Sequence, residues 1–91
     1  MLVTLHYDYV PDVATRRAPF REGHLALLRD WHAQGKIRMA GAYDPPSGGA
    51  LFVFDVASPA EVEAYVAADP YVKNGIVTGH RVRPWNLVIG G

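Results

Sequence analysis

The 91-residue chain contains no cysteine. Disulfide bonds, thiolate metal ligands, iron–sulfur clusters and cysteine nucleophiles are therefore excluded together, because each of them needs a thiol. The chain also has no surplus of either charge, since nine lysines and arginines balance nine aspartates and glutamates. A protein that binds the phosphate backbone of nucleic acid needs a basic surplus, so we expect no nucleic-acid partner. Neutrality also leaves little electrostatic repulsion against association with a second copy.

Long apolar runs are missing as well. The longest of them, such as residues 50–54, are far shorter than the ~20 residues that span a bilayer. The start of the sequence has no basic segment of the kind that opens a signal peptide. The composition, with 49% hydrophobic and 20% charged residues, is that of an ordinary globular protein rather than a disordered one. We therefore expect one cytoplasmic domain over residues 1–91 with no membrane partner.

The hydrophobic pattern predicts four strands and two main helices. Strands are predicted where β-favouring residues alternate with period two, and helices where apolar residues recur every three to four positions. The predicted strands cover residues 1–9, 36–43, 50–56 and 78–87, the last open to extension through 88–89, and the predicted helices cover about 19–34 and 59–69. Ser58, Pro59 and Glu61 have the spacing of a capping box, which predicts the start of the second helix. Residues 44–49 are a polar hairpin loop.

The resulting order is that of the ferredoxin-like split β-α-β-β-α-β fold, of the α+β class. In this fold an antiparallel sheet carries both helices on one face, so the opposite face has no helical cover. Apolar and aromatic side chains are frequent in the predicted strands, and leaving them in water is unfavourable. We therefore expect a homodimer that buries the helix-free sheet face, as in dimeric αβ-barrels.

Common motifs for phosphate, metal and nucleotide binding are absent. The glycine pairs do not form a phosphate-binding loop, and no HExxH sequence occurs. His24 and His32 are about two helical turns apart, which is too far for them to share one ion. We therefore expect neither a metal nor a cofactor.

Arg17, Arg21 and His24 recur at intervals of four and three residues, so they lie along one side of a helix. Two arginines and a histidine on one stripe can hold an anionic or enolic oxygen. Spacing alone gives more weight to the alternative, which is a solvated helix face with a capping histidine. It also does not select an acidic partner for the histidine among the aspartates of the chain.

Two motifs, in this order, resemble the YciI-like (YCII-related) family. They are Arg-x2-His-Leu at residues 21–25 and Asp-Pro-Tyr-x3-Gly at residues 69–75. The first strand, the segment 35–41 and the closing Val-Arg-Pro-Trp at 82–85 extend the resemblance over nearly the whole chain. The loop 44–49 is shorter than in the longer family members.

The resemblance implies a ferredoxin-like fold, a sheet-to-sheet dimer and a pocket centred on His24 and Asp69. The best-understood reaction in the family removes HCl from a chlorinated hydroxyquinol. By this resemblance, His24 is the catalytic acid and base, and Asp69 orients its ring and balances its charge. Arg17 and Arg21 would then bind an oxyanion of the substrate.

Tyr7 and Tyr71 are further candidates for contact with the substrate. The leading hypothesis is a small cofactor-independent lyase, dehydrochlorinase or isomerase that acts on a small phenolic or enolisable molecule. The alternatives are a non-catalytic ligand-binding or regulatory module and a purely structural dimerisation unit.

The remaining histidines are predicted to be dispensable, with the role of the first one left open. They are His6, His32 and His80.

Overall fold

The structure is a single antiparallel sheet covered by helices on one side. The computed structural model describes all residues, 1–91. The strands are β1 (Leu2–Tyr9), β2 (Ile37–Ala42), β3 (Ala50–Asp55) and β4 (Val77–Pro84), and they lie in the order β2-β3-β1-β4. Every neighbouring pair is antiparallel. The sheet order and the element order confirm the predicted ferredoxin-like α+β fold.

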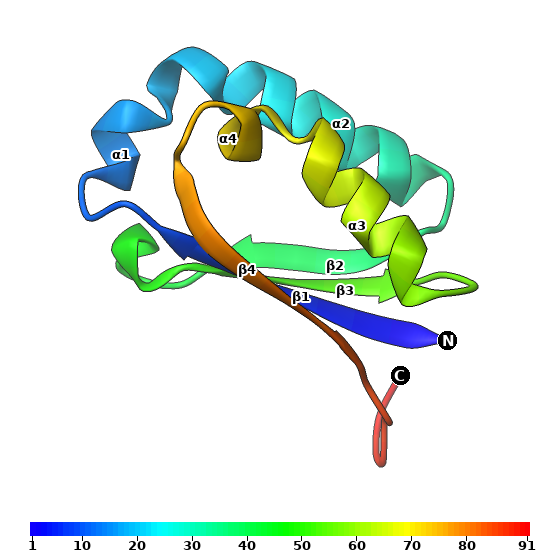
Figure 1. Ribbon diagram of the computed structural model, residues 1–91. Helices are drawn as coiled ribbons and strands as arrows, with labels where there is room; N and C mark the ends of the chain where they lie inside the picture. Colours follow the sequence, from blue (N-terminus) through cyan, green and yellow to red (C-terminus); the bar gives the residue numbers. More distant parts are fainter.

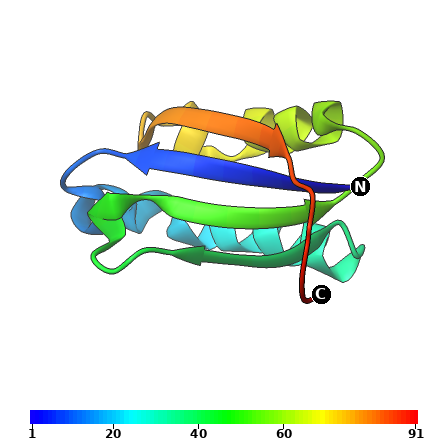
Figure 2. The same cartoon turned by 90° about the horizontal axis from the view of Figure 1, so that it is seen from below.

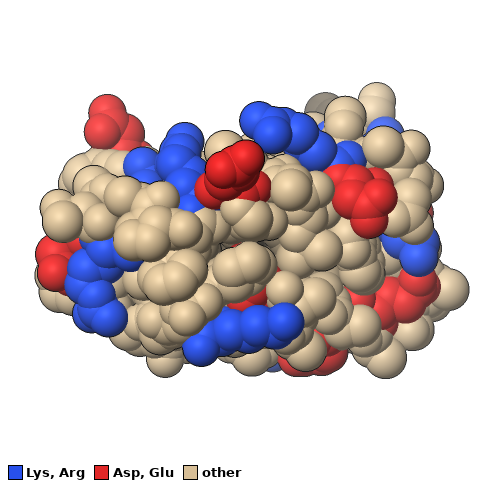
Figure 3. All heavy atoms as spheres, turned by 90° about the horizontal axis from the view of Figure 1, so that it is seen from above, with Lys and Arg blue, Asp and Glu red and all other residues tan.

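Figure 1 shows all the α-helices above one face of this sheet. They are α1 (Val13–Arg16), α2 (Arg21–Ala33), α3 (Pro59–Ala68) and α4 (Pro70–Lys73), with short 3₁₀ turns η1 (Ala18–Phe20) and η2 (Pro46–Gly48). None of these helices is both long and apolar enough to cross a membrane. On the helix-covered side, basic and acidic side chains are interspersed, without a continuous basic area (Figure 3).

Prolines set several boundaries that the sequence pattern placed only approximately. The predicted first helix begins as the 3₁₀ turn η1, which contains Pro19, before α2 starts at Arg21. The predicted second helix ends at Ala68 because a residue that precedes proline is excluded from helical backbone angles. The last strand ends at Pro84 and does not extend through 88–89, because its partner β1 begins at Leu2 and offers no further residues to pair with.

The start of α3 differs in detail from the predicted capping box. Ser58 is the residue before the first helical turn, as predicted, but its hydroxyl makes no capping hydrogen bond. The Glu61 carboxylate instead accepts a hydrogen bond of 2.8 Å from the backbone N–H of Ala57. This bond, with help from Lys36, lowers the pKa of Glu61.

The core lies between the sheet and the helices and is rich in aromatic rings. On β1 the alternate residues from Val3 to Tyr9 point into this layer, because side chains alternate across a strand. From the helix side α3 contributes Val62, Tyr65 and Val66. The long helix α2 has only one buried residue, and that residue is His24. A histidine at the most buried position of a helix needs a polar partner inside the protein.

The helix-free face of the sheet is partly crossed by the chain that follows β4, as Figure 2 shows. Exposed apolar side chains gather on this side. Met39 and Leu51 are 66% and 39% exposed, and Val88 and Ile89 in the C-terminal segment are 95% and 89% exposed. In a lone chain this much apolar surface lies in water.

Candidate functional site

Asp69 lies at the junction of α3 and α4, where Pro70 controls the backbone. Its φ and ψ of −74° and 122° are extended, as expected for a residue before proline. In this conformation the side chain turns inward and accepts a hydrogen bond of 3.0 Å from the backbone N–H of Tyr71. Asp69 is therefore the N-cap of α4, and the side chain has no exposure to solvent.

His24, which is 45 residues away in sequence, meets this carboxylate directly. Its Nδ1 lies 2.9 Å from Oδ1 and 3.0 Å from Oδ2 of Asp69. A carboxylate can only accept hydrogen bonds, so Nδ1 must carry the proton in this contact. Nε2 is therefore the nitrogen left for a ligand. The predicted contact between the two side chains is present. Asp69 makes it in addition to the capping bond that it accepts from the Tyr71 backbone N–H.

A third donor completes the environment of the carboxylate. The Tyr7 hydroxyl on β1 donates a hydrogen bond of 2.8 Å to Oδ2 of Asp69. Burial raises the pKa of Tyr7, and the nearby Asp69 charge raises it further, so the hydroxyl stays protonated. The buried negative charge thus has three donors from three different elements, which offsets the cost of removing it from water.

Two aromatic rings contact the His24 imidazole. The Tyr71 ring stacks face to face on it, with centroids 3.8 Å apart and an angle of 3° between the planes. The Phe52 ring lies nearly perpendicular to it, at an interplanar angle of 79° and with centroids 6.5 Å apart. The bonds of the Asp69 carboxylate and these two rings together restrict both the position and the rotation of the imidazole.

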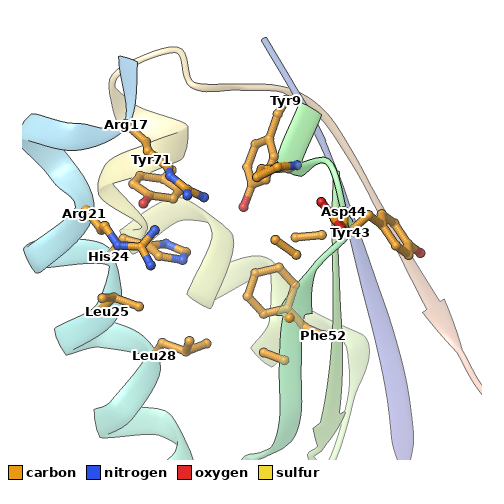
Figure 4. A pocket seen from close by; sticks show the side chains of 15 residues that line it. Tyr9, Arg17, Arg21, His24, Leu25, Leu28, Tyr43, Asp44, Phe52 and Tyr71 are labelled. Atoms are coloured by element: carbon orange, nitrogen blue, oxygen red, sulfur yellow. The ribbon is translucent and has the colours of Figure 1, made fainter. Parts of the chain in front are cut away.

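The imidazole is one wall of a pocket of about 400 Å³. Figure 4 shows the opening between α2 on one side and strands β2 and β3, with the loop between them, on the other. The lining residues are Tyr9, Arg17, Arg21, His24, Leu25, Leu28, Ala40, Gly41, Ala42, Tyr43, Asp44, Pro46, Ala50, Phe52 and Tyr71. Apolar and charged groups are both present, as is usual for sites that bind small molecules.

Four of the six predicted site residues line this pocket, and Asp69 lies directly behind one of them. Arg17 and Arg21 flank the turn into α2 and reach the same cavity as His24 and Tyr71. The expected single helical stripe is wrong in detail, because Arg17 precedes η1 and only Arg21 and His24 are on α2, but all three side chains face the pocket. Burial raises the pKa of Tyr71, while the two arginine charges oppose that shift. The roles of these residues in binding and catalysis stay predictions.

The sequence suggested Tyr7 as a residue that contacts the substrate, but Tyr7 does not line the pocket. Its ring is fully buried, and its hydroxyl is used by Asp69. Two residues further along the same face of β1, Tyr9 does line the cavity, as does Phe52 on β3. Strand alternation places both tyrosines on the helix side but does not indicate which one lies beneath α4 and which one reaches the cavity.

The other histidines lie away from this pocket. His32 is exposed on α2, and His80 contacts Glu63 at 3.1 Å on the surface. His6 is on β1 but points to the helix-free side, where its Nδ1 lies 2.9 Å from an Arg81 nitrogen. No group of three or more histidine, cysteine, aspartate or glutamate side chains is arranged to hold a metal ion.

Comparison with known proteins agrees with this fold and pocket. A family model described as the YCII-related domain matches residues 1–86. The proteins named YciI from Escherichia coli O6:H1 and from Shigella flexneri are each 28% identical to the chain, over 97% of its length and 99% of theirs. These matches cover both the α2 segment and the segment that contains Asp69.

A solved structure is also similar over nearly the full length. It is 5-chloro-2-hydroxyhydroquinone dehydrochlorinase (TftG) from Burkholderia phenoliruptrix AC1100, in complex with 2,5-dihydroxybenzoquinone. The TM-score is 0.81 and the sequence identity 26%, with 94% of each chain covered.

The contact between Tyr7 and Asp69 gives a test of the carboxylate environment. Replacement Tyr7→Phe keeps the ring and removes one donor from a fully buried charge. We expect the free energy of unfolding, measured by urea denaturation, to fall by about 1–3 kcal/mol. Tyr43→Phe is the control, because Tyr43 is 45% exposed, and its effect should stay within about 0.5 kcal/mol. Equal stability of the two variants would contradict this description of the site.

Proposed function

The chain belongs to the family of YCII-related domains, and we propose that it is a small cofactor-independent enzyme that moves a proton on a small phenolic or enolisable molecule. One observation carries the proposal. The only buried residue of α2 is a histidine that bonds through Nδ1 to a fully buried carboxylate, and its ring borders a pocket of about 400 Å³. This arrangement suits general acid–base catalysis, because the carboxylate orients the ring and leaves one nitrogen for the substrate.

In the proposed mechanism the His24 ring keeps its Nδ1 proton throughout and donates it in a hydrogen bond to the Asp69 carboxylate. Its Nε2 accepts a proton from an O–H or C–H group of the substrate. The imidazolium that forms lies 2.9 Å from the Asp69 oxygen, so its charge is balanced at once. The proton then returns to another atom of the substrate or leaves to solvent, and Asp69 remains ionised.

Arg17 and Arg21 supply the complementary charge. Proton removal leaves negative charge on an oxygen of the substrate, and two guanidinium groups at the same pocket stabilise that charge. Neither arginine forms an ion pair with an acidic side chain of the protein. Their charges are therefore available to a ligand.

The similar structure supports a particular reaction class. TftG is named as a dehydrochlorinase of a chlorinated hydroxyhydroquinone. In such an elimination a base removes the proton, the electron pair moves into the ring system and chloride leaves, without an oxidant or reductant. A lyase, dehydrochlorinase or isomerase reaction needs only the base and the anion-stabilising groups described above.

We expect His24→Gln to separate catalysis from binding. With 5-chloro-2-hydroxyhydroquinone as substrate and chloride release as the assay, turnover should fall by about 10²–10⁴-fold, because glutamine cannot accept the proton. Glutamine still reaches Asp69, so binding measured by calorimetry should change by less than about threefold. His32→Gln, on the exposed side of the same helix, should behave as the wild type.

Two results would contradict the proposed catalysis. One is a His24→Gln protein as active as the wild type. The other is a wild-type protein that binds the compound but releases no chloride, and that outcome favours the non-catalytic ligand-binding or regulatory module.

We also propose that two copies associate through the helix-free sheet face. Strand alternation places the exposed Met39 and Leu51 on this side, Trp85 shares a surface hollow with Met39, and the segment that crosses the face contains the exposed Val88 and Ile89. A second copy of the same face would remove these apolar groups from water without opposing net charges.

Light scattering at micromolar concentration should therefore give twice the chain mass of 10.0 kDa. A Leu51→Glu substitution, near the start of the central strand β3, should shift the protein toward the monomer, because it buries a charge against the partner. Ala26→Glu, exposed on α2 at the helix-covered side, is the matched control and should remain dimeric. A wild-type protein with the mass of one chain at all concentrations would contradict this association.

A further inference from the structure

The pocket contains more hydrogen-bond donors than the protein itself uses. Arg17 and Arg21 have no acidic partner. The Tyr71 hydroxyl is buried beside the Arg21 guanidinium, which can only donate, so the hydroxyl proton has no acceptor within the protein. Buried polar groups are nearly always paired, so a buried donor without an acceptor beside a cavity is available to a water molecule or a ligand in that cavity.

Tyr9 adds a donor that the sequence motifs do not indicate. It lies at the end of β1 and lines the cavity, and its hydroxyl, unlike that of Tyr7, takes no part in the hydrogen bonds around Asp69. Figure 4 shows this hydroxyl directed into the open space, toward the side that holds Arg17, Tyr71 and His24. The ring is fixed by edge contacts with Tyr71 at 6.2 Å and with Tyr7 at 6.1 Å. The hydroxyl is thus held in place but left free to donate.

Acceptors are scarce by comparison. Asp44 is the only carboxylate among the lining residues, and Figure 4 places it across the cavity from the two arginines. The charge in the pocket is therefore divided, with two positive groups on the helical wall and one negative group on the opposite rim. A ligand that matches this division carries its negative oxygen toward the arginines and a neutral or hydrogen-donating part toward Asp44.

The space between these groups favours a flat ligand. Phe52, Leu28 and Leu25 supply apolar walls, and the Tyr71 ring lies parallel to the imidazole. Planar rings pack well against such aromatic and aliphatic surfaces.

We propose that Tyr9 is a third anion-binding residue of the pocket and that the ligand is a planar organic oxyanion, a phenolate or enolate, whose negative oxygen lies between the Tyr9 hydroxyl and the guanidinium groups of Arg17 and Arg21. This inference rests on the proposed function, since it names the class of molecule that the His24 pocket takes. Tyr9 donates a hydrogen bond to the oxygen and does not transfer its proton.

The environment of Tyr9 agrees with that role. Burial raises the pKa of Tyr9 and the charge of Asp69 adds to the shift, while the two arginines oppose it. The net direction is upward, so the hydroxyl keeps its proton and remains a donor at every physiological pH. A hydrogen bond from a neutral hydroxyl to a charged oxygen is stronger than one to a neutral oxygen.

The test compares two ring compounds by titration calorimetry at neutral pH. The probe is 2,5-dihydroxybenzoquinone, whose acidic hydroxyl groups make it an oxyanion, and hydroquinone is the uncharged reference of similar size. Tyr9→Phe should weaken binding of the quinone by about 10-fold or more and binding of hydroquinone by less than about threefold. His32→Gln, on the exposed side of α2 and outside this pocket, is the control and should change either affinity by less than about twofold.

A second variant makes the result independent of packing around Tyr9. Arg21 is exposed at the start of α2, so Arg21→Gln should fold normally, and it should also weaken quinone binding by about 10-fold. Unchanged quinone affinity in Tyr9→Phe would overturn the proposal, as would a wild-type protein that prefers hydroquinone. These outcomes are distinct from failure of the proposed catalysis, because His24→Gln tests turnover and these titrations measure binding alone.

Discussion

The buried carboxylate of Asp69 is the group on which the geometry of the pocket depends. It has no solvent exposure, so its charge must be stabilised entirely by the protein. Three donors do so. They are the Tyr7 hydroxyl on β1, the His24 ring on α2 and the Tyr71 backbone N–H on α4. These bonds connect the sheet to two helices at one point. A carboxylate bonded in this way cannot move without leaving a buried charge unpaired, so it fixes the histidine that borders the cavity.

The same contact explains why a histidine is the most buried residue of α2. Its Nδ1 is satisfied by the carboxylate, and its faces are covered by Tyr71 on one side and by core aromatic rings nearby. Only the remaining nitrogen lacks a protein partner. In the proposed function the Nδ1 bond fixes the orientation of the ring, and Nε2 exchanges protons with the ligand. The arginines and Tyr9 then act on the oxygen atoms of that ligand rather than on the histidine.

Much of the fold follows from local patterns in the sequence, whereas the site follows from them only in part. Strand alternation and helical spacing predicted the order of elements, because each element buries one face. Helical spacing also placed two arginines and His24 on one stripe. It did not identify Asp69, since long-range pairing depends on where α3 ends relative to α2. That residue came from the family resemblance. Alternation likewise did not separate Tyr7 from Tyr9, because it gives the face of a residue but not its neighbours across the layer.

In the proposed site Asp69 holds the Nδ1 proton of His24 and leaves Nε2 free for the ligand. Nitrogen NMR of the ¹⁵N-labelled imidazole, at a pH where the ring is neutral, measures which nitrogen carries the proton. We expect a proton on Nδ1 and an unprotonated Nε2 in the wild type, with this preference lost in Asp69→Asn. A wild-type His24 with its proton on Nε2, or an Asp69→Asn protein with the same distribution as the wild type, would contradict it.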